Sequence, residues 1–124
     1  MSQVLAVAAG GAAGAVLRLW VSSAVYALAG RDFPYGTLAV NVLGSLAMGV
    51  LFVLLVERMD ADPLWRAGLL IGLLGAFTTF STFSMETLAL LEEGQAGRAL
   101  ANMGLSVMLC VGAAWLGVLL GRTL

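Results

Sequence analysis

Four apolar runs constrain the fold of this chain more than any other feature. Each is long enough to cross a bilayer as a helix, since about 20 residues rise roughly 30 Å. The first contains one charge, Arg18, and the third continues past Glu86, whereas the second and fourth are uncharged. The sequence predicts one all-α membrane domain over residues 1–124. Its four transmembrane helices are expected at about 4–29, 36–56, 67–91 and 99–121.

The composition excludes several classes of function. Hydrophobic residues make up 61% of the chain and charged residues 10%, whereas soluble domains are about 25% charged. The chain has no histidine, and Cys110 is its only cysteine, so we expect no thiolate metal site and no serine–histidine nucleophile. A net charge of −1 provides no excess of positive charge for binding nucleic acid. We therefore predict a protein of the lipid bilayer that is not an enzyme.

The arginines of the short connecting segments barely favour one orientation. With both termini inside, three arginines face inward and two face outward: Arg58, Arg66 and Arg122 against Arg31 and Arg98. Arginine and lysine in short loops set membrane orientation. This small excess of arginines, or a partner protein, fixes one orientation of the chain in the membrane. Otherwise the chain inserts in both orientations.

Residues 75–84 form the most polar stretch inside an apolar run. They hold three phenylalanines and five hydroxyl residues: Phe77, Phe80 and Phe83, with Thr78, Thr79, Ser81, Thr82 and Ser84. As one helix, the segment places a phenyl stripe beside a hydroxyl track that ends near Glu86. The hydroxyls either bond to carbonyls one turn earlier or line a path for an ion.

The third helix is expected to break near the membrane midplane. Gly72 and Gly75, followed by the β-branched pair Thr78 and Thr79, weaken the helix there. A break frees backbone carbonyls, which a membrane tolerates only where they are buried in protein or face a cavity or an ion.

Other polar residues lie within the apolar runs. Asn41 either presents N–H groups to an anion or forms an interhelical hydrogen bond. Arg18 is expected to pair with Glu86, to cap freed carbonyls or to attract an anion. Asn102 and Ser106, spaced i and i+4, are candidates to line the same path.

Four short helices cannot easily enclose a polar path and shield it from lipid, so the sequence favours a homodimer. The dimer is antiparallel if both orientations are populated. Glycine pairs spaced by four residues permit tight helix contacts. They occur at Gly10/Gly14, Gly68/Gly72 and Gly117/Gly121.

Hydroxyl and amide donors beside phenyl rings suit a small anion. The edge of a phenyl ring is its positive rim, so paired phenylalanines attract an anion weakly. Weak ligation lets the ion leave again, as conduction requires.

Residues 10–18, 36–41 and 75–84 together resemble the Fluc family of fluoride channels, also called CrcB. The resemblance implies a passive, fluoride-selective channel that exports fluoride across the cytoplasmic (inner) membrane of a prokaryote. It also implies a multi-pass, dual-topology, antiparallel homodimer with two pores.

The resemblance also implies roles for individual residues. The paired phenylalanines correspond to Phe80 and Phe83 and the pore asparagine to Asn41. The polar track corresponds to Ser81 and Thr82, with Ser106 on the fourth helix. A structural sodium ion at the dimer interface would be held by the backbone carbonyls of Gly75 and Thr78 from each subunit. Arg18 and Glu86 match the family's arginine and carboxylate, and Asn102 stands where the family often has an aromatic residue.

Two other functions are compatible with four short helices. A small dual-topology drug/proton antiporter needs a titratable carboxylate in the membrane, for which Glu86 is the only candidate. A structural subunit without transport of its own is the other alternative.

Overall fold

The computed structural model describes residues 1–124 and is all helical, as predicted. Four helices are long and apolar enough to span a membrane. The first is α1 (Ser2–Ala29), and the second joins α2 (Tyr35–Phe52) to the π-helix η1 (Val53–Arg58). The third combines α3 (Pro63–Arg66), the π-helix η2 (Ala67–Leu74), α4 (Gly75–Phe77) and α5 (Phe80–Glu92). The fourth is α6 (Ala96–Thr123).

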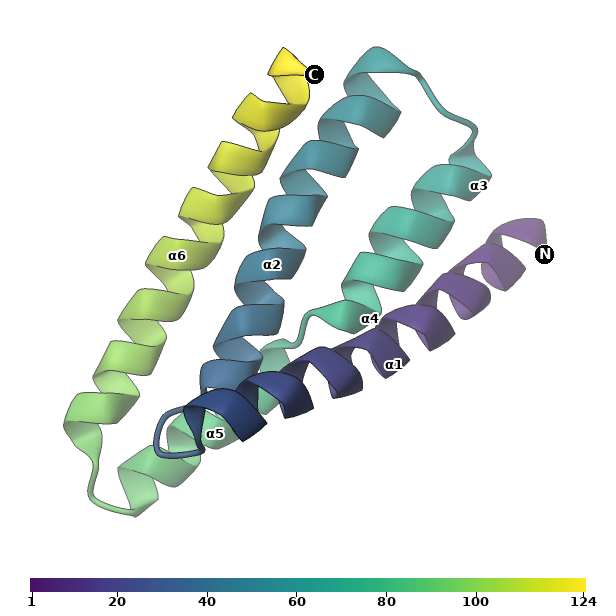
Figure 1. The fold of residues 1–124 in the computed structure, drawn as a ribbon. Coiled ribbons are helices and arrows are strands. Elements are labelled where there is room, and N and C mark those ends of the chain that lie inside the picture. The colour runs from purple at the N-terminus through teal and green to yellow at the C-terminus, as the bar shows by residue number, and fades with distance from the viewer.

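Glycines bring the helices into close contact within one chain. In Figure 1, α2 and α6 run side by side, and α1 passes along η2 and α4. A Cβ atom on Gly14 would collide with the backbone of Leu73, and one on Gly10 with the backbone of Gly68. Gly117 is packed in the same way against the backbone of α2. The glycine pairs therefore make tight contacts between helices of the same chain.

The third span is interrupted between α4 and α5. Thr78 (φ −89°, ψ 160°) and Thr79 (φ −152°, ψ 122°) have extended backbones, and the helix restarts at Phe80. Figure 1 shows this stretch as a non-helical connection. Its placement at the membrane midplane stays a prediction. The prediction that three phenylalanines form one stripe along a continuous helix is wrong for Phe77. This residue lies before the interruption and packs near Gly44 of α2.

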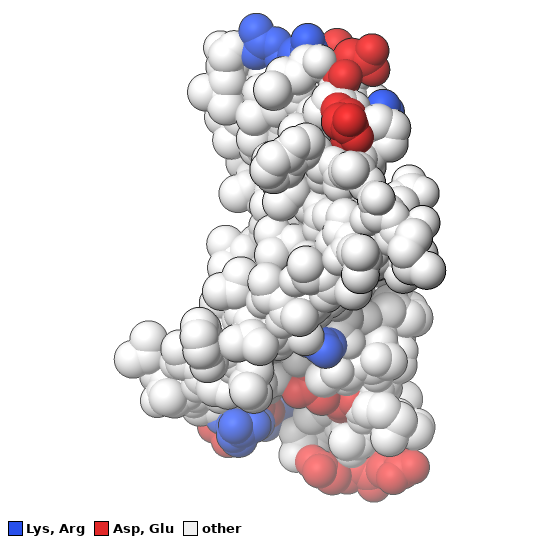
Figure 2. Space-filling view, turned by 90° about the vertical axis from the view of Figure 1, so that its right-hand side faces the viewer, with Lys and Arg blue, Asp and Glu red and all other residues white.

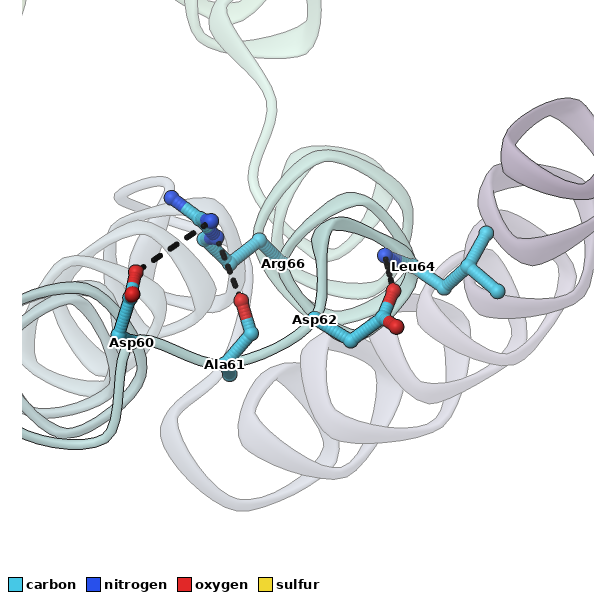
Figure 3. A network of polar contacts seen from close by, with 5 residues as sticks. All are labelled: Asp60, Ala61, Asp62, Leu64 and Arg66. Carbon is cyan, nitrogen blue, oxygen red and sulfur yellow. Dashed lines mark hydrogen bonds and ion pairs between the residues drawn. The ribbon is translucent and has the colours of Figure 1, made fainter.

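The loop before α3 is organised by side-chain hydrogen bonds (Figure 3). The carboxylate of Asp62 accepts a hydrogen bond from the Leu64 N–H at 2.9 Å, and Pro63 occupies the first helical turn. Arg66 donates from Nε to the Ala61 carbonyl at 3.1 Å and lies 3.8 Å from an Asp60 oxygen. These contacts explain why this helix begins at Pro63, before the apolar run itself.

Charged side chains gather at the two ends of the molecule. Figure 2 shows a broad, largely uncharged surface between them. At one end, Arg122 pairs with Glu57 at 3.2 Å, and Arg58 donates to the backbone carbonyls of Gly121 and Leu124. This distribution is the one expected of helices that cross a bilayer.

Candidate ion pathway

Asn41 binds the backbone where the third span is interrupted. Its Nδ2 donates to the Thr79 carbonyl at 2.9 Å, and its Oδ1 accepts from the Thr79 N–H at 2.7 Å. The amide therefore replaces the helical partners that Thr79 lacks. Of the two roles expected for Asn41, the interhelical hydrogen bond is present. Because the amide nitrogen carries two hydrogens, one donor remains for another ligand.

The two carbonyls expected to hold sodium have lost their usual donors. In a continuous helix the N–H of residue i+4 bonds to the carbonyl of residue i. The Thr79 N–H, which would serve Gly75, bonds to Asn41 instead. The Thr82 N–H, which would serve Thr78, bonds to the Thr79 hydroxyl at 3.1 Å. The interruption thus leaves the carbonyl oxygens of Gly75 and Thr78 without these partners.

The five hydroxyl residues separate into two kinds. Thr78 donates to the Leu74 carbonyl at 3.0 Å and Ser84 to the Phe80 carbonyl at 2.9 Å, as hydroxyls in membrane helices often do. The Thr79 hydroxyl instead lies 3.1 Å from that of Thr82 and 3.3 Å from that of Ser81. Thr79, Ser81 and Thr82 therefore form a connected hydroxyl cluster at the start of α5.

A cavity of about 400 Å³ lies between α2, the interruption and α6. Its lining brings together the following predicted residues: Asn41, Thr78, Phe80, Phe83 and Ser106. The rings of Phe80 and Phe83 are 5.3 Å apart at an angle of 44°. Phe80 is 78% exposed in the single chain, so most of its surface is free to meet lipid or a second protein.

Asn102 joins α5 to α6. It is 1% exposed, and its Nδ2 donates to the Thr87 hydroxyl at 2.9 Å. The Ser106 hydroxyl donates to the Asn102 Oδ1 at 3.4 Å. Asn102 thus holds Ser106 at the cavity wall, and its contacts are structural.

Glu86 lies in a hydrogen-bonded cluster rather than beside Arg18. Tyr26 donates to Glu86 Oε2 at 2.5 Å, and the hydroxyl of Thr37 donates to Oε1. Arg18 makes no ion pair in the chain. It lines a separate cavity of about 250 Å³ with Thr37 and Thr82. The expected pairing of Arg18 with Glu86 is therefore absent from the single chain.

Sequence reasoning missed Tyr26 and Thr37. A tyrosine and a threonine near the ends of adjacent apolar runs were the only available signal. Nothing in the spacing shows that both reach the same carboxylate on the third span.

Comparison with known proteins identifies related sequences over nearly the whole chain. The family model described as "CrcB-like protein, Camphor Resistance (CrcB)" matches residues 5–118. A protein of Methylococcus capsulatus named fluoride-specific ion channel FluC is 54% identical over 121 residues, which cover 98% of this chain and 53% of the relative. Proteins with the same name are 55% identical in Magnetococcus marinus, over 97% of this chain and 98% of the relative, and 47% identical in Geobacter sulfurreducens, over the full length of both.

Proposed function

Because the chain belongs to the CrcB family, we propose that it is a fluoride channel, the function for which its relatives are named. The family is one of ion channels and not of enzymes. The proposed activity is passive export of fluoride across the cytoplasmic (inner) membrane of a prokaryote. Four apolar helices and bacterial relatives support that location.

The observation that carries the proposal is the cavity beside the paired rings of Phe80 and Phe83. Asn41 and Ser106 also line this cavity, so two phenylalanine rings and two polar side chains border one space. The ring edges and the free N–H of Asn41 would stabilise an anion without a fixed positive charge. Ser81 and Thr82 would continue the path along α5 with hydroxyl donors. Such weak, repeated ligation favours rapid passage.

We further propose an antiparallel homodimer with sodium at its interface. Carbonyl oxygens are hard ligands of the kind that sodium accepts, and those of Gly75 and Thr78 lack their helical donors. One chain offers only these two, so a second copy would complete the set. The 78% exposure of Phe80 supports a further chain at this face, as does the near balance of loop arginines.

The drug/proton antiporter is not favoured. Its carboxylate would be Glu86, whose two oxygens both accept hydroxyl hydrogen bonds, and the relatives are named as channels.

Growth of a fluoride-sensitive bacterium that lacks its own fluoride exporter tests the proposal in cells. Expression of this chain should restore growth in fluoride, whereas expression of the Phe80→Ile, Phe83→Ile double variant at equal membrane abundance should not. Equal failure of both chains would contradict fluoride export.

A further inference from the structure

Tyr26 holds Glu86 at the junction of two cavities. One, of about 310 Å³, lies at a charged end of the molecule and includes Arg31, Arg98 and Glu93 in its lining. The other, of about 350 Å³, follows the hydroxyl face of α5 and includes Ser81 and Thr82. Glu86 lines both cavities. An ion that entered at the charged end and continued to Ser81 and Thr82 would come near this carboxylate.

The surroundings of Tyr26 fix the position of its ring. A Cβ atom on Gly36 would collide with the ring edge, so the glycine lets the ring lie directly against α2. On another side, the guanidinium of Arg31 lies 4.5 Å from the ring centroid, within the range of a cation–π contact. The Tyr26 phenol thus lies between α2 and the loop that follows α1, and its hydroxyl donates to Glu86.

We propose that Tyr26 is a positioning residue for ion passage: its hydrogen bond, with that of Thr37, keeps the Glu86 carboxylate from turning toward the hydroxyls of Ser81 and Thr82. Those two hydroxyls contact Thr79 instead. This inference rests on the proposed fluoride channel. A carboxylate that turns into the track would repel an anion and accept hydrogen bonds from the hydroxyls that should serve the ion. Tyr26 and Thr37 prevent this by donating to one carboxylate oxygen each.

The two tyrosines of the chain provide a matched test. Tyr26→Phe retains the ring on Gly36 and under Arg31 but removes the hydroxyl. Tyr35→Phe removes a hydroxyl for which the structure shows no hydrogen bond. The Tyr35 ring packs against that of Phe33, with 5.2 Å between the ring centroids. In liposomes we expect Tyr26→Phe to lower fluoride efflux by about tenfold, because a charge-assisted hydrogen bond is lost. Tyr35→Phe should match the unmodified chain.

An infrared readout distinguishes positioning from a general structural defect. The difference spectrum between the unmodified chain and Glu86→Ala isolates the Glu86 carboxylate band. This band should shift in Tyr26→Phe and stay in place in Tyr35→Phe, with the oligomer on size-exclusion chromatography unchanged in both. Normal efflux in Tyr26→Phe, or reduced efflux with an unshifted band, would overturn the proposal.

Thr37→Val keeps the test decisive if Tyr26→Phe does not fold. It removes the other donor to the same carboxylate, and both efflux and the band should change as for Tyr26→Phe. An unaltered efflux in a folded Thr37→Val protein would contradict the need for a held carboxylate. If the unmodified chain conducts no fluoride, the proposed function fails, while the infrared shift still shows whether Tyr26 binds Glu86.

Discussion

At the scale of single residues, the polar side chains near the interruption differ in their hydrogen-bond partners. Asn41 satisfies the Thr79 backbone and keeps one donor free. Thr78 and Ser84 bond to their own helices, whereas Ser81 and Thr82 belong to the hydroxyl cluster with Thr79. Only part of the polar stretch is therefore available to an ion, and each residue can be tested separately.

Phe80→Ile and Phe83→Ile should each lower fluoride efflux from liposomes by about tenfold or more. Isoleucine retains apolar volume but removes the positive ring edge that attracts an anion. Phe52→Ile is the control, because Phe52 lies at the end of α2 and does not line the cavity. The proposed dimer should persist on size-exclusion chromatography. Normal efflux in both variants would exclude the phenyl-edge mechanism.

Asn41→Ala should reduce both conduction and thermal stability. It leaves the N–H and carbonyl of the buried Thr79 without partners, and each unpaired buried group costs about 1–3 kcal/mol. Unfolding in detergent, followed by circular dichroism, should begin at a lower temperature. Ser84→Ala, which removes only an exposed hydroxyl bonded within its own helix, should change neither property. An Asn41→Ala protein of unchanged stability would show that the Thr79 contact is dispensable.

At the scale of helices, apolar runs predicted the number and order of the spans because length and hydropathy decide membrane insertion. The first residue of a helix depends on local capping, as Asp62 and Pro63 show for the third span. The π-helical turns of η1 and η2 were not predicted, since no sequence pattern distinguishes them from α-helix. The contact of Tyr26 with Glu86 was equally hidden, because it depends on how α1 packs against the third span.

Gly14→Ala should destabilise the packing of α1 on η2. The added methyl group meets the Leu73 backbone, which cannot rotate away as a side chain would, and overpacking of this kind costs about 1–3 kcal/mol. Gly97→Ala in the first turn of α6 is the matched control, since nothing lies within 4 Å of its new Cβ. Its helix should be stabilised by about 0.5–1 kcal/mol. Equal melting temperatures for the two variants would contradict the close contact.

At the scale of the whole molecule, several residues of the candidate pathway lie at the surface of the single chain. Charges gather at the two ends, and Phe80 is largely exposed. A second copy would cover this face, and two antiparallel copies would produce two equivalent paths. The short helices and the near balance of loop arginines predict a homodimer, and the resemblance to a family adds the two pores. This arrangement stays a prediction, because the structure contains a single chain.

Fluoride efflux from liposomes that contain only the purified protein is the decisive measurement of fluoride selectivity. Valinomycin dissipates the membrane potential in potassium-loaded vesicles, and chloride serves as the control anion. A fluoride-selective channel should release fluoride rapidly without a proton gradient and release negligible chloride. Absence of fluoride release from well-folded protein, or equal release of both anions, would contradict a fluoride-selective channel.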